Sequence, residues 1–304
     1  MSRLAIVIPY YKIDFFEETL QSVAAQSNRD FVLYIGNDAS HNDPLPLIEK
    51  YLSDFSYFYF DYNDNLGGKN LALQWERILE NVKEDWFQIL GDDDIISENF
   101  VEEFYKNLPQ IQSENISAIK FSHNIVDENK AILHSITTEE KIIASPELFK
   151  RKYKGQMPSS LSENIFTLSA YKKHRFLKIP FAWGADDYAI LSFSGLNKVF
   201  YIANAKVTVR MSTSSISGDL SLQAKKDLGY HMMRETVLNK YSENFDKSFL
   251  IRMLNDHLRF CEKNFLRPHL RLFKILMKRG YPKRYFEMTK TVWSIKNKIK
   301  HSKG

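Results

Sequence analysis

The sequence contains little cysteine and no long hydrophobic run, and each shortage excludes a class of protein. Its one cysteine, Cys261, excludes an intrachain disulfide framework and a metal cage built from several cysteines. No apolar run approaches the roughly 18 residues that a membrane span requires. The opening segment 1–12 has a short apolar run without a cleavage signature, so it predicts a first strand rather than a signal peptide. We therefore expect a cytoplasmic protein.

Positive charge is concentrated at the C-terminal end. Residues 263–304 contain 13 Lys and Arg and one acidic residue, which gives +12, whereas the rest of the chain carries −7. Five apolar residues there recur at helical spacing: Tyr285, Met288, Val292, Ile295 and Ile299. This stripe is typical of a surface helix packed on the rest of the protein, or of a helix lying on anionic lipid. No nucleic-acid-binding motif accompanies the charge, so we expect no nucleic-acid partner.

The first hundred residues alternate between strand and helix patterns. Such alternation predicts a mostly parallel sheet with helices on both faces. In these sheets ligands bind beyond the carboxyl ends of the strands, where Asp38 and Asp92–Asp94 fall. From residue 249 onward the pattern is helical. The expected strands span 4–11, 30–40, 56–63 and 86–92, and the expected helices span 14–27, 43–55 and 70–82.

Three consecutive aspartates, Asp92 to Asp94, follow the apolar run that ends at Gly91. One interpretation is a solvated loop or a helix start, although Ser97 is the better N-cap for the next helix. The other is a divalent cation site, because Mg²⁺ and Mn²⁺ prefer oxygen ligands and are often held by carboxylates together with substrate phosphates. Spacing alone leaves open which metal–phosphate enzyme this would be.

Five segments taken in order resemble the family 2 glycosyltransferases, which have the GT-A fold. The resemblance covers about half of the chain, densely over 4–104 and again at 183–191 and 207–218. The segments are "AIVIPYYK", "TLQSVAAQSNRDFVLYIGNDAS", "NDNLGGKNLAL", "WFQILGDDDII" and "WGADDYAIL".

This resemblance implies an α/β, GT-A-like domain over 1–245, with a nucleotide-binding half at 1–104 and an acceptor half at 105–245. A basic helical region would occupy 246–304. It also implies a nucleotide-sugar donor, a divalent metal (Mn²⁺ or Mg²⁺) and transfer with inversion. The implied nucleotide-binding residues are Pro9, Tyr11, Asp38, Gly68, Lys69, Asp92 and Asp93, with Gly67 beside them. The implied metal ligands are Asp94 and Asp92, the catalytic residues are Asp187 as general base and Asp186, and Trp183 and Arg210 would face acceptor or phosphate.

Two positions depart from the family pattern. Gly91 stands at the first place of the D-x-D-D run, so Asp92 and Asp94 supply the remaining pair. Ser212 stands where the family often has a histidine, so Arg210 would take more of the phosphate charge.

The resemblance implies transfer of a sugar, most simply from a UDP-sugar, to a glycan or lipid-linked acceptor in bacterial capsule or lipopolysaccharide synthesis. The enzyme would then work peripherally at the inner face of the cell membrane. One alternative is a sugar nucleotidyltransferase, but the glycine-rich loop that such enzymes carry after the first strand is replaced by "PYYKIDFFEE". The other is a catalytically silent glycan- or nucleotide-binding protein, which retention of both acidic motifs argues against.

Overall fold

The computed structural model describes residues 3–213 and 215–301, and the chain forms two compact units, Met1–Lys226 and Asp227–Gly304. We expected the second region to begin at 246. The chain divides inside helix α8 (Gln223–Tyr241) instead. His231 of this helix stacks on Phe260 of the following helix, with ring centroids 4.1 Å apart, so most of α8 packs with the C-terminal helices.

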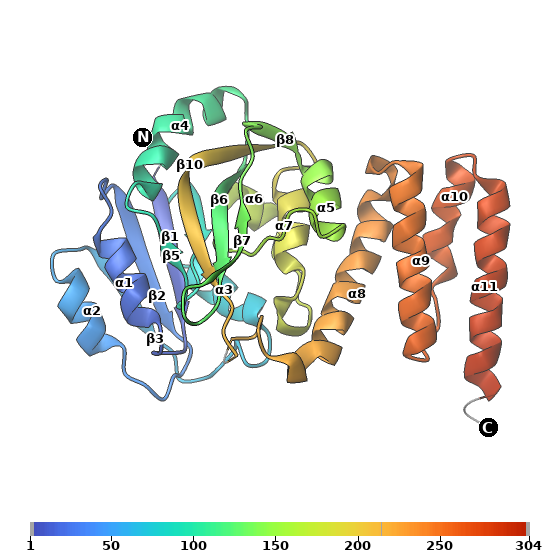
Figure 1. Ribbon diagram of the computed structural model, residues 1–304, viewed down its shortest axis with the longest axis horizontal. Helices are drawn as coiled ribbons and strands as arrows, with labels where there is room; N and C mark the ends of the chain where they lie inside the picture. Colours follow the sequence, from blue (N-terminus) through green and yellow to red (C-terminus); the bar gives the residue numbers. More distant parts are fainter. Residues whose placement is uncertain (1–2, 214, 302–304) are drawn as a thin grey trace. The chain divides into compact units, whose positions relative to one another are not determined.

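In the described part of the first unit, ten strands form one sheet (Figure 1). Its main path runs in the order β3-β2-β1-β4-β9-β6-β10-β5, while β7 pairs with β6 and β8 with β10. The β1–β2, β1–β4, β2–β3 and β6–β10 pairs are parallel, whereas the β4–β9, β6–β9, β6–β7, β5–β10 and β8–β10 pairs are antiparallel. The predicted parallel arrangement therefore holds for β1–β4, while the sheet as a whole is mixed. The strands are β1 (Leu4–Tyr10), β2 (Phe31–Asn37), β3 (Tyr57–Asp61), β4 (Trp86–Ile89), β5 (Ile95–Ile96), β6 (Ala118–Val126), β7 (Ile132–Ile136), β8 (Ile142–Ala144), β9 (Asn164–Thr167) and β10 (Lys198–Arg210).

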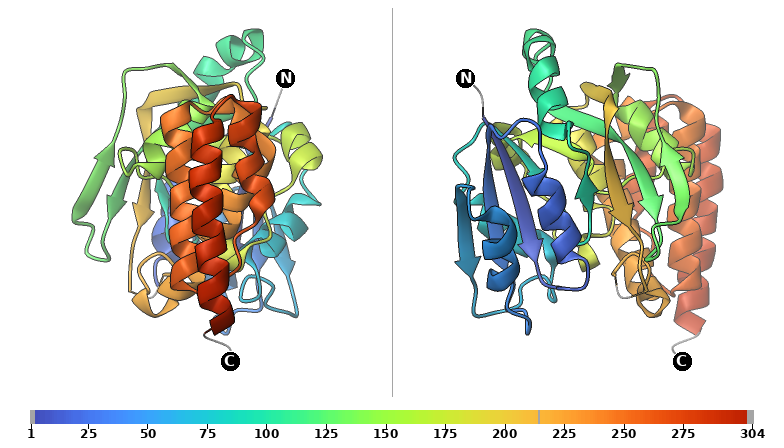
Figure 2. Two further views of the ribbon diagram at one scale, coloured as in Figure 1. Left: turned by 90° about the vertical axis from the view of Figure 1, so that its right-hand side faces the viewer. Right: turned by 60° about the vertical axis from the view of Figure 1, so that its left-hand side comes forward.

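Helices cover both faces of this sheet (Figure 2). Their apolar residues recur at helical spacing and point toward the strands. Helices α1, α2 and α4 pack on one face, and α3, α6 and α7 pack on the other. The helices of this unit are α1 (Phe16–Ala24), α2 (Leu45–Leu52), α3 (Leu71–Leu79), α4 (Phe100–Ser113), α5 (Ser145–Tyr153), α6 (Leu168–His174) and α7 (Ala185–Phe193).

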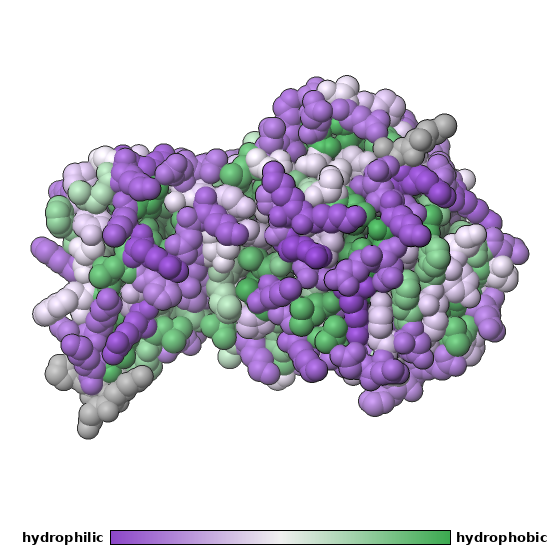
Figure 3. All heavy atoms as spheres, turned by 180° about the vertical axis from the view of Figure 1, so that it is seen from behind, coloured by the Kyte–Doolittle hydropathy of each residue, from purple (hydrophilic) through white to green (hydrophobic). Residues whose placement is uncertain are grey.

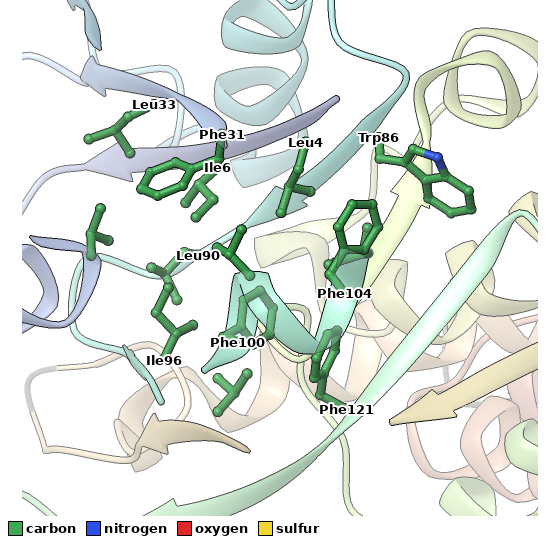
Figure 4. Packing of buried hydrophobic residues seen from close by; sticks show 14 of the residues in the cluster. Leu4, Ile6, Phe31, Leu33, Trp86, Leu90, Ile96, Phe100, Phe104 and Phe121 are labelled. Carbon is green, nitrogen blue, oxygen red and sulfur yellow. The ribbon is translucent and has the colours of Figure 1, made fainter. Parts of the chain in front are cut away.

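Successive side chains of β1 point to opposite faces of the sheet, so the hydrophobic core has one part on each face. Leu4 and Ile6 point into the cluster drawn in Figure 4, where Phe100 of α4 stacks on Phe121 of β6 at 4.1 Å. On the opposite face Phe87 of β4 contacts aromatic side chains from α6 and β9. Because β1 and β4 are buried on both sides, their sequences are apolar except at Gln88, whose side chain donates to the Ser162 carbonyl.

The second unit is helical. After α8 it contains α9 (Lys247–Lys263), the 3-10 turn η4 (Leu270–Phe273), α10 (Lys274–Lys278) and α11 (Pro282–His301). The predicted apolar stripe of α11 is turned inward, since Met288, Val292 and Ile295 are at most 6% exposed and α11 contacts α9 and α10. Hydrophilic residues with small apolar patches between them cover the face of this unit seen in Figure 3. Within the described residues, no helix has the length and apolar character needed to span a membrane.

Candidate active site

An open cleft of about 1590 Å³, including the solvent at its mouth, lies where β1, β2 and β4 end. Parallel strands bring their carboxyl ends to the same edge of the sheet, which explains why segments far apart in sequence meet here. Nine of the expected site residues line this cleft: Pro9, Tyr11, Asp38, Gly68, Asp92, Asp93, Asp94, Trp183 and Arg210.

Asp38, directly after β2, is almost fully buried and anchors one wall of the cleft. Its two carboxylate oxygens accept hydrogen bonds from the backbone N–H groups of Leu66 (2.8 Å) and Gly67 (2.7 Å). Arg77 of α3 forms an ion pair with the same carboxylate. A carboxylate has about four acceptor positions, so Asp38 retains the capacity to accept a further bond from a nucleotide base.

Gly67 is needed here for close packing. A Cβ atom at this position would lie 2.5 Å from the Asp38 carboxylate, closer than van der Waals contact permits. We expected Gly67 to let the backbone approach a ligand. In the structure it lets the loop approach Asp38, which in turn fixes the neighbouring Gly68 at the cleft.

The aspartate triplet follows β4 and is held mainly by backbone N–H groups. Asp92 accepts bonds from the N–H groups of Tyr11 and Lys12, both at 2.7 Å. Asp94 accepts one from the N–H of Arg210 at 2.9 Å and another from the Ser162 hydroxyl. These contacts tie the ends of β1, β4 and β10 together and turn the carboxylates toward the cleft that all three line.

The electrostatics of the triplet fit a cation site. Burial raises the pKa of Asp92 and of Asp94, the latter to about 6. Burial also raises the pKa of Asp93 well above its usual range, and the charges of Asp94 and Asp92 add to this rise. Three crowded carboxylates therefore oppose one another's ionisation, and a divalent cation bound to their oxygens would remove that penalty. Asp92 and Asp94 have the oxygen chemistry that Mg²⁺ or Mn²⁺ requires.

Arg210, at the end of β10, lines the cleft but its guanidinium bonds to protein oxygens. Nη2 pairs with Glu18 at 2.6 Å, Nε donates to the Asp93 carbonyl at 3.2 Å, and Nη1 donates to the Glu128 carbonyl at 3.3 Å. The guanidinium also lies over the Phe15 ring at 4.0 Å. A role for Arg210 in binding phosphate would therefore require an exchange of partners.

The second acidic motif occupies the first turn of α7. Lys152 of α5 contacts both members of the pair: its Nζ is 2.7 Å from an Asp186 oxygen and 2.8 Å from Asp187 Oδ1. Asp187 Oδ2 is buried and has no hydrogen-bond partner among the described residues. Asp187 lines a separate cavity of about 280 Å³ with Lys152 and Ser159, while the next residues of that segment, 160–162, line the cleft.

This environment raises the pKa of both Asp187 and Lys152, for different reasons. Burial raises the pKa of Asp187 to about 7; Lys152 opposes the rise and Asp186 adds to it. Burial alone would lower the pKa of Lys152, but the two aspartates raise it above its usual value. Asp187 is thus poised to exchange a proton near neutral pH, which suits a general base.

Two further expected residues differ in their placement. Trp183 lines the cleft, and Lys226 Nζ lies 5.0 Å from its ring centre while donating to the carbonyls of Ser217 (3.0 Å) and Asp219 (2.8 Å). Trp183 is therefore packed beside the segment that follows β10. Lys69, by contrast, is exposed on the loop before α3.

Sequence reasoning missed three side chains that support the site: Arg77, Lys152 and Ser162. Each contacts its aspartate from a distant part of the chain, and none stands in a motif. An arginine or lysine on a helix and a serine in a loop are ordinary surface residues by pattern. Only tertiary contacts identify them: those of α3 and of the 159–162 segment with the cleft, and those of α5 with the acidic pair of α7.

Residues 5–178, more than half of the chain, match the family described as glycosyl transferase family 2. The chain therefore belongs to glycosyl transferase family 2, and this region is a glycosyltransferase domain. A curated relative, glycosyltransferase GlyA from Streptococcus pneumoniae serotype 4 (strain ATCC BAA-334 / TIGR4), is 21% identical over 212 residues, which are 67% of this chain and 29% of the relative. The chain thus spans less than a third of that relative's length.

Solved structures of S. aureus TarS 1-349 are similar in fold. The complex with UDP has a TM-score of 0.58 at 14% identity and covers 99% of this chain and 90% of that chain. The complex with UDP-GlcNAc has the same TM-score and identity and covers 99% and 91%. These likenesses confirm the predicted α/β, GT-A-like class with its large central sheet and flanking helices.

Proposed function

We propose that this protein transfers a sugar from a nucleotide-diphosphate donor to a glycan or lipid-linked acceptor. The observation that carries the proposal is the convergence of Asp38, Tyr11 and the aspartate triplet on one cleft at the carboxyl ends of three parallel strands. The base would lie against Tyr11 and Pro9 and bond to Asp38. The donor is best taken as a UDP-sugar, since the TarS structures of this fold contain UDP and UDP-GlcNAc.

Asp92 and Asp94 would hold Mn²⁺ or Mg²⁺, with Asp93 toward the ribose. When bound, such an ion supplies positive charge that offsets the charge of the diphosphate leaving group. Asp187 accepts the proton of the acceptor hydroxyl as that oxygen attacks the anomeric carbon, and Lys152 holds the acidic pair in place. One attack without a covalent sugar–enzyme intermediate inverts the anomeric centre. Trp183 packs on a sugar face, and Arg210 contributes positive charge beside the triplet.

The test is nucleotide release from a panel of nucleotide-sugars, beginning with UDP-GlcNAc, in Mn²⁺, in Mg²⁺ and in EDTA. We expect metal-dependent release from one donor by the wild type and little or none by Asp94→Asn. Donor binding measured by calorimetry in parallel separates a missing acceptor from a missing activity. If no donor bound in the presence of Mn²⁺ and none bound in the presence of Mg²⁺, the proposal would be contradicted.

We also propose that the acceptor belongs to bacterial surface polysaccharide synthesis, as capsule or lipopolysaccharide, and that the protein meets it at an anionic membrane surface. The supporting observation lies on the outer side of α11. Phe286 and Trp293, seven residues apart and so on one helix face, are 58% and 69% exposed, and Lys283 and Lys290 beside them are exposed as well. Exposed aromatics among lysines are typical of helices at the lipid interface.

Cosedimentation with vesicles tests this surface. We expect binding to vesicles that contain phosphatidylglycerol, weaker binding at high salt, and loss of binding in the double variant Phe286→Ser, Trp293→Ser. These two side chains are exposed, so the variant should keep its fold, unlike a truncation that removes the buried stripe of α11. Equal binding to neutral vesicles would contradict the electrostatic part of the proposal.

A further inference from the structure

The second unit contains a buried cluster of metal-ligating side chains that glycosyl transfer does not use. His231 and Glu235 lie one turn apart on α8, and His257 and Cys261 lie one turn apart on the facing side of α9. Ligand atoms of His231, His257 and Cys261 all lie within 4.8 Å of one another. Paired positions four residues apart on two packed helices are how helix bundles build metal sites.

The cluster leaves polar atoms unsatisfied. His257 is 0% exposed and His231 is 5% exposed, yet the Nδ1 atoms of both rings are buried without a hydrogen-bond partner among the described residues. Buried polar groups are normally paired, because an unpaired one loses its hydrogen bonds to water without replacement. His231 Nδ1 would regain a partner by binding an ion, whereas His257 Nδ1 faces the Glu235 carboxylate.

The position of Glu235 indicates which imidazole nitrogens could bind an ion. Its Oε1 lies 3.6 Å from His257 Nδ1, 3.8 Å from His231 Nε2 and 2.9 Å from Nδ1 of the more exposed His269. The other nitrogen of His257, Nε2, is 3.7 Å from Cys261 Sγ. The carboxylate therefore faces one nitrogen of each buried ring and leaves His257 Nε2 and His231 Nδ1 for an ion. Carboxylates that orient metal-binding imidazoles in this way are common outer partners.

We propose that His231, His257 and Cys261 bind a divalent transition-metal ion, Zn²⁺ first, with Glu235 orienting the imidazoles, and that the ion ties α8 to α9. Imidazole nitrogen and thiolate sulfur are the ligands that zinc prefers, whereas Mg²⁺ and Mn²⁺ prefer oxygen. This site therefore differs in chemistry from the aspartate cleft. The Cys261 thiol releases its proton as the sulfur binds the ion, so binding one ion frees one proton.

The rings need a small adjustment to do this. They are stacked with 9° between their planes and 4.9 Å between their centres, so one ring turns about its Cβ–Cγ bond to direct its nitrogen at the shared ion. A neutral imidazole then offers the ion a nitrogen lone pair.

Cobalt substitution of the wild-type full chain is the decisive test. Cys261 is the only cysteine, so a cobalt–thiolate charge-transfer band can arise only at this cluster and not at the aspartates. We expect the band to saturate at one Co²⁺ per chain and to disappear when Zn²⁺ is added. No band from folded protein with excess Co²⁺ would overturn the proposal, and this measurement requires no variant.

Variants then assign the ligands. Cys261→Ser should abolish the band, and His231→Asn or His257→Asn should weaken Zn²⁺ binding by more than the roughly 10- to 100-fold that loss of an outer partner costs. The control is His134→Asn, an exposed histidine in β7 of the first unit. Zn²⁺ should raise the melting temperature of the wild type and of Asp94→Asn alike. The same rise in Cys261→Ser would instead place the ion elsewhere and overturn the assignment.

Discussion

The first unit contains two acidic motifs that are built in opposite ways. The triplet Asp92–Asp94 lines an open cleft and receives its hydrogen bonds from backbone N–H groups and the Ser162 hydroxyl. The pair Asp186–Asp187 starts a helix beside a small cavity, and Lys152 contacts both carboxylates. One motif crowds like charges together, whereas the other carries its own countercharge.

This difference explains how the two motifs divide the proposed work. Crowded carboxylates gain most from a bound divalent ion, so the triplet suits metal and diphosphate. A carboxylate balanced by a lysine has no need of an external cation. It can instead be tuned by burial toward a proton-transfer role.

Replacing one aspartate in each motif should show most clearly that the two motifs have different roles. We expect Asp187→Asn to lower kcat by roughly 10²–10⁴ while donor affinity stays within about twofold of the wild type, because only proton transfer is lost. Asp94→Asn should instead remove metal-dependent donor binding. Calorimetric donor titration and steady-state kinetics on both variants check this. If donor affinity fell in Asp187→Asn while kcat held, the roles of the two motifs would need to be exchanged.

The next largest effect is expected in the pH dependence of wild-type activity. A general base must be unprotonated, and burial raises the pKa of Asp187 to about 7. We therefore expect kcat/KM to fall as pH decreases below about 7, by about tenfold per unit for one proton. The measurement is kcat/KM from pH 5.5 to 8.5 at saturating metal. A rate that is flat down to about pH 5 would mean that another group accepts the proton.

Much of the fold followed from local sequence patterns. Apolar runs alternating with helically spaced apolar residues predicted β1 through β4 and the helices between them. Each of those segments is long enough to show its pattern. The insertion of β9 antiparallel between β4 and β6 was not predicted. Its four residues are too few to show a period, and its partners lie far away along the chain.

Some residues of the site could likewise be predicted from the sequence, and others could not. Asp38 and the triplet were predictable because they end buried strands, and position in the topology gives their neighbours. The lysine that pairs with Asp187 lies 35 residues before it, on a helix of ordinary amphipathic sequence. Ser162 likewise reaches Asp94 only through the tertiary fold. Residues that support a site leave weak local signals, since many sequences can place a hydroxyl or an amine there.

Removing the countercharge from the pair should make it behave more like the triplet. In Lys152→Met the charge that lowers the pKa of Asp187 is gone, so the acid limb of the pH profile should move to higher pH. At pH 7 the rate should fall on the order of tenfold, since an opposite charge this close shifts a carboxyl pKa by about one unit or more. Lys152→Arg keeps the charge and serves as the control. A uniform loss of rate at every pH, with the limb unmoved, would indicate structural damage only.

The smallest effect is expected from removing a single support of the triplet. The Ser162 hydroxyl donates to Asp94 Oδ2 and accepts from the Gly91 N–H at 3.0 Å. Ser162→Ala should cost about 1 kcal/mol in metal binding, or about fivefold in Mn²⁺ affinity, because a typical hydrogen bond contributes that much. The neighbouring Ser160→Ala is the control, since its hydroxyl bonds to Glu163 instead. Mn²⁺ titration followed by calorimetry measures both variants. Equal losses in the two would trace the effect to the loop rather than to Asp94. An unchanged affinity in Ser162→Ala would mean that the backbone N–H groups alone are sufficient to hold the triplet in place.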